Sequence, residues 1–352
     1  MVDLTTTYAG LKLKSPIIAA SSSLTASPAK IKTFAEAGAG AVILKSIFEE
    51  QIQNEAADTY DQSHDFPEAY NYIKEYSEEH SIRQHVQLVR EVKEAVDIPV
   101  FASINCSSSE GWVDYAKSLS DAGADGLELN VMRIETDRTQ DYGEPERAII
   151  KIVTELTESG FDKPLVVKIS KYYSNLIRLC ADLHMVGADG VVLFNRSYMP
   201  DVDLSAERLS AGPVFSSPSD FYDGLRFTAL VHGAVPGLSV SISSGARNGK
   251  DVLKGVLAGA NAIQMASILY GKKEKAITES LDEVKSWMEE HKYESITEMT
   301  GRLAAEQVDK ANFLARSQFM KYFDSPEAGH PTNTFSGAVA VSYTHLTLPT
   351  IA

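Results

Sequence analysis

The feature of this sequence that most constrains its fold is a short segment that occurs four times. It reads EAGAGAVILKS at residues 36–46, SDAGADGLELN at 120–130, MVGADGVVLFN at 185–195 and LAGANAIQMAS at 257–267. In each copy a glycine follows a helical pattern, at the position where the end of a helix favours a residue that can adopt positive φ. A nearly continuous apolar run comes next, as in strands that are buried on both faces of a parallel sheet. Each copy therefore predicts a turn from a helix into a buried strand.

Four other strand candidates alternate with these copies: SPIIAAS, IPVFASIN, KPLVVKIS and LSVSISSG. The two sets together predict eight strands, at about residues 16–21, 40–45, 98–105, 126–131, 164–170, 190–195, 238–244 and 262–267. Helical segments separate most of them, so the repeating unit is βαβα. Four such units predict the α/β class and a closed (β/α)8 TIM barrel. A doubly wound open sheet is the competing fold, but it does not require this fourfold regularity.

The segments outside the repeat are expected to decorate the barrel. VDLTTTYAGLKLKSP, near the start, predicts an N-terminal β-hairpin with Gly10 in its turn, which would plug the barrel floor. Long insertions are expected after the second strand, with a helix near 82–96, and after the sixth strand. Both leave the carboxyl ends of strands, where barrels place active sites. We expect one domain over 1–325 and an unstructured or non-native tail over 326–352, with a terminal strand as the alternative for the tail.

Composition and charge exclude several classes of protein. The net charge of −15 argues against nucleic acid and against an anionic membrane surface as partners. Two cysteines, Cys106 and Cys180, give no disulfide framework and no iron–sulfur cluster, so a reducing cytoplasm is the expected location. We expect no metal site and no signal peptide. We also expect no membrane-spanning segment, because no apolar run approaches about 18 residues.

Polar residues end most of the predicted strands. Two lysines and three asparagines are expected on the same rim of the barrel: Lys45, Lys168, Asn105, Asn130 and Asn195. An unpaired buried lysine costs several kcal/mol, so two of them imply an anionic or electron-rich ligand. The amides supply both donors and acceptors, which suit a flat heterocycle with carbonyl and ring N–H groups. For any one of these residues alone, a polar contact between loops is the alternative.

The last two predicted strands indicate a phosphate site. SISSGARNGKDVL reads as a strand, a turn of small residues and a helix start with Asn248 or Asp251 as its cap, and QMASILYG places small residues after the eighth strand. Small residues let backbone N–H groups approach an anion, and these two turns are the usual phosphate site of the barrel. A phosphorylated planar cofactor, FMN, fits this pattern, with Lys168 stabilising the reduced ring.

These segments resemble the dihydroorotate dehydrogenase family, the flavin-dependent barrel enzymes of pyrimidine synthesis, over roughly residues 3–323. The most specific matches are SPIIAASSS, VILKS, ELN, VVKIS, FN and SSGARNGKDVLKGVLAGANAIQMASILY, and they are closer to the soluble class. The resemblance implies flavin contacts from Ala20, Ser21, Lys45 and Ser46. It implies that Asn105, Asn130, Lys168 and Asn195 serve both flavin and substrate. It also implies a phosphate site at Ser244, Gly245, Ala266 and Ser267, where the family commonly has Gly for Ser244 and Gly-Thr for the last two.

The sequence departs from this family at the catalytic position. The soluble class has a Cys in an Asn-x-Ser-Cys-Pro-Asn stretch, whereas this chain reads NVMRIETD at 130–137, with Met132 or Arg133 in that place. Neither side chain is an ordinary general base. Other residues considered near the predicted pocket are Thr136, Thr139, Tyr142, Cys106 and, for the family's substrate loop, Asn71. A small buried thiol is the preferred interpretation of Cys106.

We therefore expect an FMN-dependent dehydrogenase that acts on a CH–CH bond of a small, dihydropyrimidine-like substrate. Asn130 and Asn195 would orient the substrate, and Lys168 would tune the flavin. One alternative is a phosphate-handling aldolase or isomerase with Lys168 as its reactive amine. Another is a flavin-binding protein that has lost dehydrogenase chemistry. The resemblance suggests a homodimer, and the sequence does not identify the electron acceptor.

Overall fold

The computed structural model describes residues 2–48, 67–105, 112–132, 134–305 and 314–315, and it gives side chains from residue 79 onward in the helix that begins at Pro67. The chain divides into two compact units, Met1–Leu314 and Ala315–Ala352. Nearly all the described residues belong to the first unit. The tail predicted for 326–352 lies outside the described residues, and the domain boundary at 325 stays a prediction.

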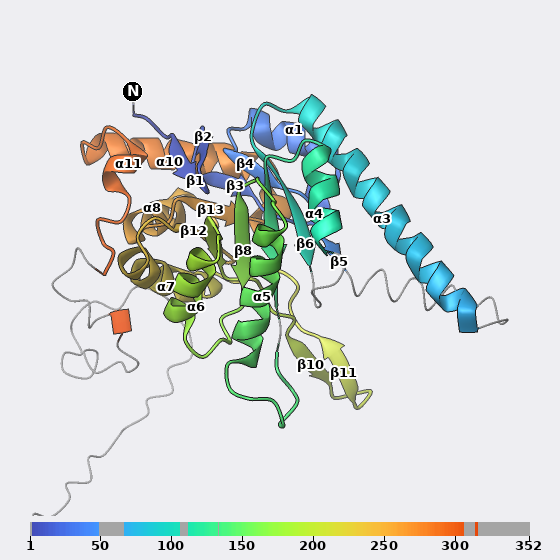
Figure 1. Cartoon of the computed structure of the whole chain (residues 1–352). Coiled ribbons are helices and arrows are strands. Elements are labelled where there is room, and N and C mark those ends of the chain that lie inside the picture. The colour runs from blue at the N-terminus through green and yellow to red at the C-terminus, as the bar shows by residue number, and fades with distance from the viewer. Residues whose placement is uncertain (1, 49–66, 106–111, 133, 306–313, 316–352) are drawn as a thin grey trace, which may run out of the picture. The chain divides into compact units, whose positions relative to one another are not determined.

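Eight parallel strands form the centre of the first unit. In chain order they are β3 (Ile17–Ala19), β4 (Ala41–Ile43), β6 (Val100–Asn105), β7 (Gly126–Asn130), β8 (Leu165–Ile169), β9 (Gly190–Leu193), β12 (Ser239–Ser243) and β13 (Ala262–Met265). Around the sheet the order is β4-β3-β13-β12-β9-β8-β7-β6, and β4 also pairs with β6 through Val42 and Val100. The ring is therefore closed, and the predicted (β/α)8 barrel is confirmed (Figure 1).

A long helix follows each barrel strand along the chain. These helices are α1 (Pro28–Glu36), α3 (Pro67–Ala95), α4 (Trp112–Asp121), α5 (Glu144–Glu158), α6 (Leu176–Met185), α7 (Asp220–Ala234), α8 (Gly249–Ala258) and α10 (Lys275–Glu290). Three short helices are η1 (Ser23–Ala26), α9 (Ser267–Lys272) and α11 (Ile296–Met299). The helix expected near 82–96 begins much earlier, at Pro67. Its first half has good helix formers and no Gly or Pro after Pro67, but it carries too few apolar residues to show a helical period.

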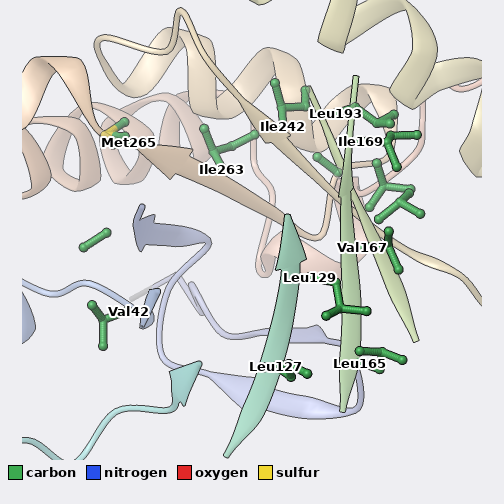
Figure 2. Close-up of a cluster of buried hydrophobic side chains, with 14 of the residues drawn as sticks. Val42, Leu127, Leu129, Leu165, Val167, Ile169, Leu193, Ile242, Ile263 and Met265 are labelled. Carbon is green, nitrogen blue, oxygen red and sulfur yellow. The ribbon is translucent and has the colours of Figure 1, made fainter. Parts of the chain in front are cut away.

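Side chains of the barrel strands alternate between two apolar layers. Those that point outward pack against the surrounding helices in one large cluster, which includes Val42, Leu127, Leu129, Leu165 and Val167 (Figure 2). Those that point inward near the floor form a smaller cluster of Ile18, Ala41, Ile43, Phe101, Val166, Val192 and Ala262. This alternation follows from the period of two along a strand. It decides which residue of each strand can reach the barrel interior.

The N-terminal hairpin closes the barrel floor, as predicted. It consists of β1 (Thr6–Tyr8) and β2 (Leu11–Leu13), joined by Ala9 and Gly10 with φ of 47° and 78°. Two positive φ values in a two-residue loop are typical of a type I′ hairpin turn. The Tyr8 ring centroid lies 5.9 Å from that of Phe101, and Tyr8 and Leu13 belong to the inner apolar cluster. The lower half of the barrel is therefore filled, and the open end lies opposite the hairpin.

The four repeated segments adopt one common turn. Their glycines have nearly equal φ values of 104°, 106°, 106° and 113° at Gly38, Gly123, Gly187 and Gly259. In three copies the polar residue two positions later accepts a hydrogen bond from an N–H at the start of the preceding strand: Asp125 from Val100 at 2.7 Å, Asp189 from Leu165 at 2.8 Å and Asn261 from Val240 at 2.9 Å. In the first copy Gly40 stands there, because a Cβ would lie 2.0 Å from the Ser15 carbonyl oxygen. The repeat thus ties each even strand to its odd neighbour at the floor.

Both predicted insertions leave the open end. The one after β4 contains β5 (Ile47–Phe48), which pairs with the end of β6, and residues 49–66 of it lie outside the described part. The one after β9 contains an antiparallel hairpin of β10 (Pro200–Asp203) and β11 (Arg208–Ala211), at the end of the barrel opposite β1 and β2 (Figure 1). In the part of the chain that the structure describes, every helix is too short or too polar to cross a bilayer.

The shared turn gives a test of the fold. Asp189→Ala removes the acceptor for the Leu165 N–H at the start of β8, so we expect the free energy of unfolding to fall by roughly 1–2 kcal/mol. Asp189→Asn keeps an acceptor, as Asn261 does in the fourth copy, and should lose clearly less. Urea unfolding with equal m-values compares the two. Equal losses in both variants would contradict this role of the side chain.

Candidate functional site

A cavity of about 280 Å³ opens at the carboxyl ends of the barrel strands. Eight of the twelve residues predicted to bind the cofactor line it: Ala20, Ser21, Lys168, Asn195, Ser244, Gly245, Ala266 and Ser267. They come from β3, β8, β9, β12 and β13 or from the residues that directly follow these strands. The closed ring has therefore gathered side chains that lie more than two hundred residues apart in the sequence.

Lys168 is the buried cation of this cavity. Its side chain is 7% exposed, and its Nζ lies 3.0 Å from Gln264 Oε1 and 3.5 Å from Glu128 Oε1. Gln264 Nε2 donates in turn to Glu128 Oε2 at 2.6 Å. The Glu128 carboxylate is fully buried. The buried ammonium of Lys168 therefore has its opposite charge inside the barrel, as the burial of a charge requires. Lys168 still reaches the cavity wall.

Glu128 and Gln264 were not among the site residues predicted from the sequence. Glu128 is the one charged residue of the apolar run GLELNV, and Gln264 has the same position in AIQMAS. Leu127 and Leu129 on either side of Glu128 point outward (Figure 2), so the period of two turns Glu128 into the barrel. A charged or amide side chain within a buried strand was the available signal. What the sequence could not show is that the two would meet Lys168.

Tyr8 of the floor hairpin lies beneath this charged layer. Burial, and then the negative charge of Glu128, raise the pKa of the Tyr8 hydroxyl well above its usual value. The side chain is fully buried. Tyr8 is therefore an uncharged residue beneath the layer of Glu128, Lys168 and Gln264.

The predicted rim amides lie side by side. Asn105, Asn130 and Lys168 occupy neighbouring register positions on β6, β7 and β8. Asn195, directly after β9, donates from its Nδ2 to Asn130 Oδ1 at 2.6 Å. Only Asn195 of these three amides lines the cavity itself, while Asn130 is buried behind it. The pair leaves one Asn195 oxygen and the Asn130 nitrogen for further partners.

Ser46 lies behind the cavity wall. Its Oγ is 3.0 Å from Ser21 Oγ and 2.7 Å from Ser103 Oγ, and its N–H donates to Ser21 Oγ at 3.1 Å. Ser21 lines the cavity, so this chain of hydroxyls fixes the wall at β3 and β4. Ser46 was predicted to contact the flavin, and in the structure it lies next to the cavity and forms hydrogen bonds with Ser21.

The structure does not bring Lys45 to this cavity. Lys45 lines a separate cavity of about 570 Å³ between α1 and α3, together with His80, Arg83 and His85. The reason is one extra residue: Ile43 pairs with Phe101 and Ile47 with Ile104, so four steps along one strand face three along the other. Such a bulge reverses the alternation. Ser46 therefore points inward, and Lys45 points outward.

The turn after β12 has the backbone expected of an anion site. Ser244 and Gly245 have φ of 75° and 81°, and two successive residues of this kind can turn their N–H groups to one side. At Gly245 a Cβ would lie 2.4 Å from the Phe221 nitrogen, so only glycine fits. Ser244 adopts a conformation that favours the Gly common in the resembling family. Of the two predicted helix caps, Asn248 accepts the Asp251 N–H, at 3.1 Å.

Loop residues that sequence analysis did not select complete the wall. Arg196 pairs with Asp220 at 3.1 Å, and Asp220 also accepts the Ser217 N–H at 2.7 Å. The Phe215 and Tyr270 rings, 5.2 Å apart, line the cavity beside Ser267. Arg196, Phe215 and Ser217 belong to the insertion after β9, where no motif marks them and their positions depend on how that insertion folds back over the barrel. Tyr270 belongs to α9, after β13.

Met132 is one of the two residues expected at the family's catalytic position. It is half-buried, and its sulfur lies 3.6 Å from the Ser197 hydroxyl, which donates to it. Thr136, Thr139 and Tyr142 are exposed and do not line the cavity around Lys168. Arg133, Cys106 and the side chain of Asn71 lie outside the described residues.

Comparison with known proteins agrees with the geometry. A model of the dihydroorotate dehydrogenase family matches residues 3–216, which is more than half of the chain. The catalytic subunit of the NAD(+)-type dihydroorotate dehydrogenase B of Pyrococcus abyssi is 26% identical over 305 residues, 83% of this chain and 96% of that protein. The protein of the same name from Thermoplasma volcanium is 26% identical over 323 residues, 86% and 98% of the two chains. The one from Bacillus pumilus is 24% identical over 218 residues, 59% and 68%.

The family match and the barrel with its rim cavity point to the same conclusion. The chain belongs to the dihydroorotate dehydrogenase family of flavoprotein oxidoreductases.

Proposed function

We propose that this protein is an FMN-dependent dehydrogenase that oxidises a small cyclic substrate of the dihydroorotate type. The observation that carries the proposal is that Lys168 and the Ser244–Gly245 turn line the same cavity. Lys168 suits an electron-rich ring, and the turn suits a phosphate. An aldolase or isomerase with Lys168 as its reactive amine would use the same two features, so the match to the dihydroorotate dehydrogenase family over residues 3–216 is what favours the flavin enzyme over that alternative.

The residues present fit the flavin. The volume of about 280 Å³ is just below the ~300–1,000 Å³ typical of ligand sites. Lys168 offers a fixed positive charge, which suits the ring edge that becomes negative on reduction. The phosphate would bind the N–H groups of Ser244 and Gly245, with Ala266 and Ser267 opposite. When bound, the flavin supplies the hydride-accepting atom of the reaction.

The substrate is proposed from the rim amides. Asn130 and Asn195 hold each other at 2.6 Å, so their free donor and acceptor have fixed directions. A ring with alternating carbonyl and N–H groups matches this pair, and the relatives' names specify dihydroorotate. These two asparagines would orient the substrate, while Lys168 would hold its charge beside the flavin. Ser46 is proposed as a residue that supports the wall at Ser21, and Asn105 as the neighbour of Asn130 on the rim. The flavin contact expected of Lys45 is not proposed, because Lys45 lines the separate cavity between α1 and α3.

The electron route and the assembly are also proposals. The names of the Pyrococcus and Thermoplasma proteins specify NAD(+) and a catalytic subunit. This favours NAD(+) as the final acceptor and a further subunit as its route. The homodimer expected from the sequence stays a prediction.

The phosphate end can be tested by ligand choice. The unmodified protein should bind FMN at least tenfold more tightly than riboflavin, because only FMN has the phosphate. Gly245→Ala should remove most of this preference, since its Cβ would meet the Phe221 nitrogen at a strained φ. Ser244→Gly, which relieves a positive φ, is the matched control and should keep the preference. Fluorescence titration of the flavin-free protein gives the affinities.

The result that contradicts this site is equal binding of FMN and riboflavin by the unmodified protein. An unchanged preference in Gly245→Ala would place the phosphate elsewhere. Thermal unfolding of each variant shows whether the barrel itself has been disturbed.

The reaction can be tested by anaerobic reduction. Adding dihydroorotate to the flavin-loaded protein should bleach the visible flavin absorption, because the ring loses its oxidised chromophore. Asn195→Ala should slow the bleaching by about tenfold or more, while flavin binding changes less. A loaded protein that dithionite bleaches but dihydroorotate does not would contradict the proposed substrate and would favour a flavin protein without this dehydrogenase activity.

A further inference from the structure

Glu128 is a fully buried carboxylate in the barrel interior to which the proposed function gives no role. It lies on β7, one inward position below Asn130, and contacts Lys168 of β8 and Gln264 of β13. These strands are not all neighbours, so the three side chains meet across the barrel. A buried ionic group of this kind is costly, and hydrophobic residues of similar volume often replace it without loss of stability. Packing alone therefore does not explain Glu128.

The hydrogen bonds fix the direction of each group. Gln264 donates from Nε2 to Glu128 Oε2 at 2.6 Å and accepts from Lys168 Nζ at Oε1, at 3.0 Å. The reverse orientation of the amide would point its nitrogen at the ammonium and its oxygen at the carboxylate. Glu128 thus orients Gln264, and Gln264 orients Lys168. The ammonium is held at 3.5 Å from Glu128 Oε1, slightly longer than its bond to the amide.

The same arrangement divides the charge. Lys168 contributes a positive charge beside the cavity, and Glu128 contributes a negative charge just beneath it. In a buried site these charges act at short range with little screening by water. A ligand ring that gains negative charge on reduction is attracted by Lys168 and repelled by Glu128. The net effect depends on how closely Gln264 lets the two groups approach each other.

We infer that Glu128 and Gln264 are positioning residues that set the reduction potential of the flavin through Lys168. Glu128 offsets part of the lysine charge and keeps the potential lower than Lys168 alone would. Gln264 limits this offset, because it shares the ammonium with the carboxylate. This inference rests on the proposed function, since it needs a flavin in the cavity that Lys168 lines.

The test is the midpoint potential of the flavin-loaded protein, measured by equilibration with a reference dye. Glu128→Gln keeps the size of the side chain and removes its charge. We expect a higher potential, with at least a tenfold larger ratio of reduced to oxidised flavin at a fixed potential, which is about 30 mV for a two-electron couple. Glu290→Gln removes the same charge from the exposed end of α10 and should leave the potential unchanged.

A second variant tests the inference by the sign of its effect. Gln264→Met has similar length but no hydrogen-bonding groups, so Lys168 keeps only Glu128 as its partner among these contacts. The lysine charge is then offset more strongly, and the potential should fall below that of the unmodified protein. A merely structural role would not move the two variants in opposite directions.

The possible failures can be told apart. A yellow, loaded protein whose potential is the same in Glu128→Gln overturns this inference alone. Loss of flavin from both buried-site variants, while Glu290→Gln retains it, also overturns the inference, because it shows a role in folding only. Unmodified protein that binds no FMN overturns the proposed function and this inference with it.

Discussion

The hydrogen bonds between β4 and β6 close the parallel sheet into a ring, and the site depends on that closure. In a closed ring all the strands point the same way, so their carboxyl ends meet at one rim. Ser21 after β3, Lys168 in β8 and Ser267 after β13 line one cavity for this reason. Without this pairing β4 and β6 would lie at opposite edges of an open sheet. The N-terminal hairpin then fills the floor, which leaves the rim as the open end.

The barrel interior is layered according to what each level must bury. The floor is apolar, with Tyr8, Phe101 and Val192 in one cluster. Above it lies the charged layer of Glu128, Lys168 and Gln264, and above that the amides and small residues of the rim. Removing one partner of a buried ion pair typically costs about 3–5 kcal/mol, because it leaves the other charge without compensation. A buried charged layer at this position is consistent with a ligand that interacts with the positive charge of Lys168.

Much of the fold could be predicted from the sequence because short local patterns mark the helix-to-strand turns and the buried strands. Gly38, Gly123, Gly187 and Gly259 require positive φ, and the apolar runs behind them are long enough to identify buried strands. The order of strands was then enough to place eight of the twelve residues predicted to bind the cofactor around one cavity, since position at a strand end assigns a residue to the rim. The first half of α3 gave no such signal, because a helix of mostly polar residues has little apolar period.

The site was less predictable wherever one residue shifts the geometry. The extra residue between Ile43 and Ile47 turns Lys45 to the outside of the barrel. No feature of the segment VILKSIF indicates a bulge at this point. Glu128 and Gln264 belong to strands on different parts of the ring, so their meeting with Lys168 needed the closed structure. Arg196 and Phe215 reach the cavity through a long loop, whose path depends on tertiary contacts.

A crystal structure of the protein with FMN would test the central claim most directly. We expect density for the flavin ring beside Lys168 and Asn195, and for the phosphate at the backbone of Ser244 and Gly245. Density for FMN in the cavity beside Lys45, or none at the barrel mouth in crystals saturated with FMN, would contradict it.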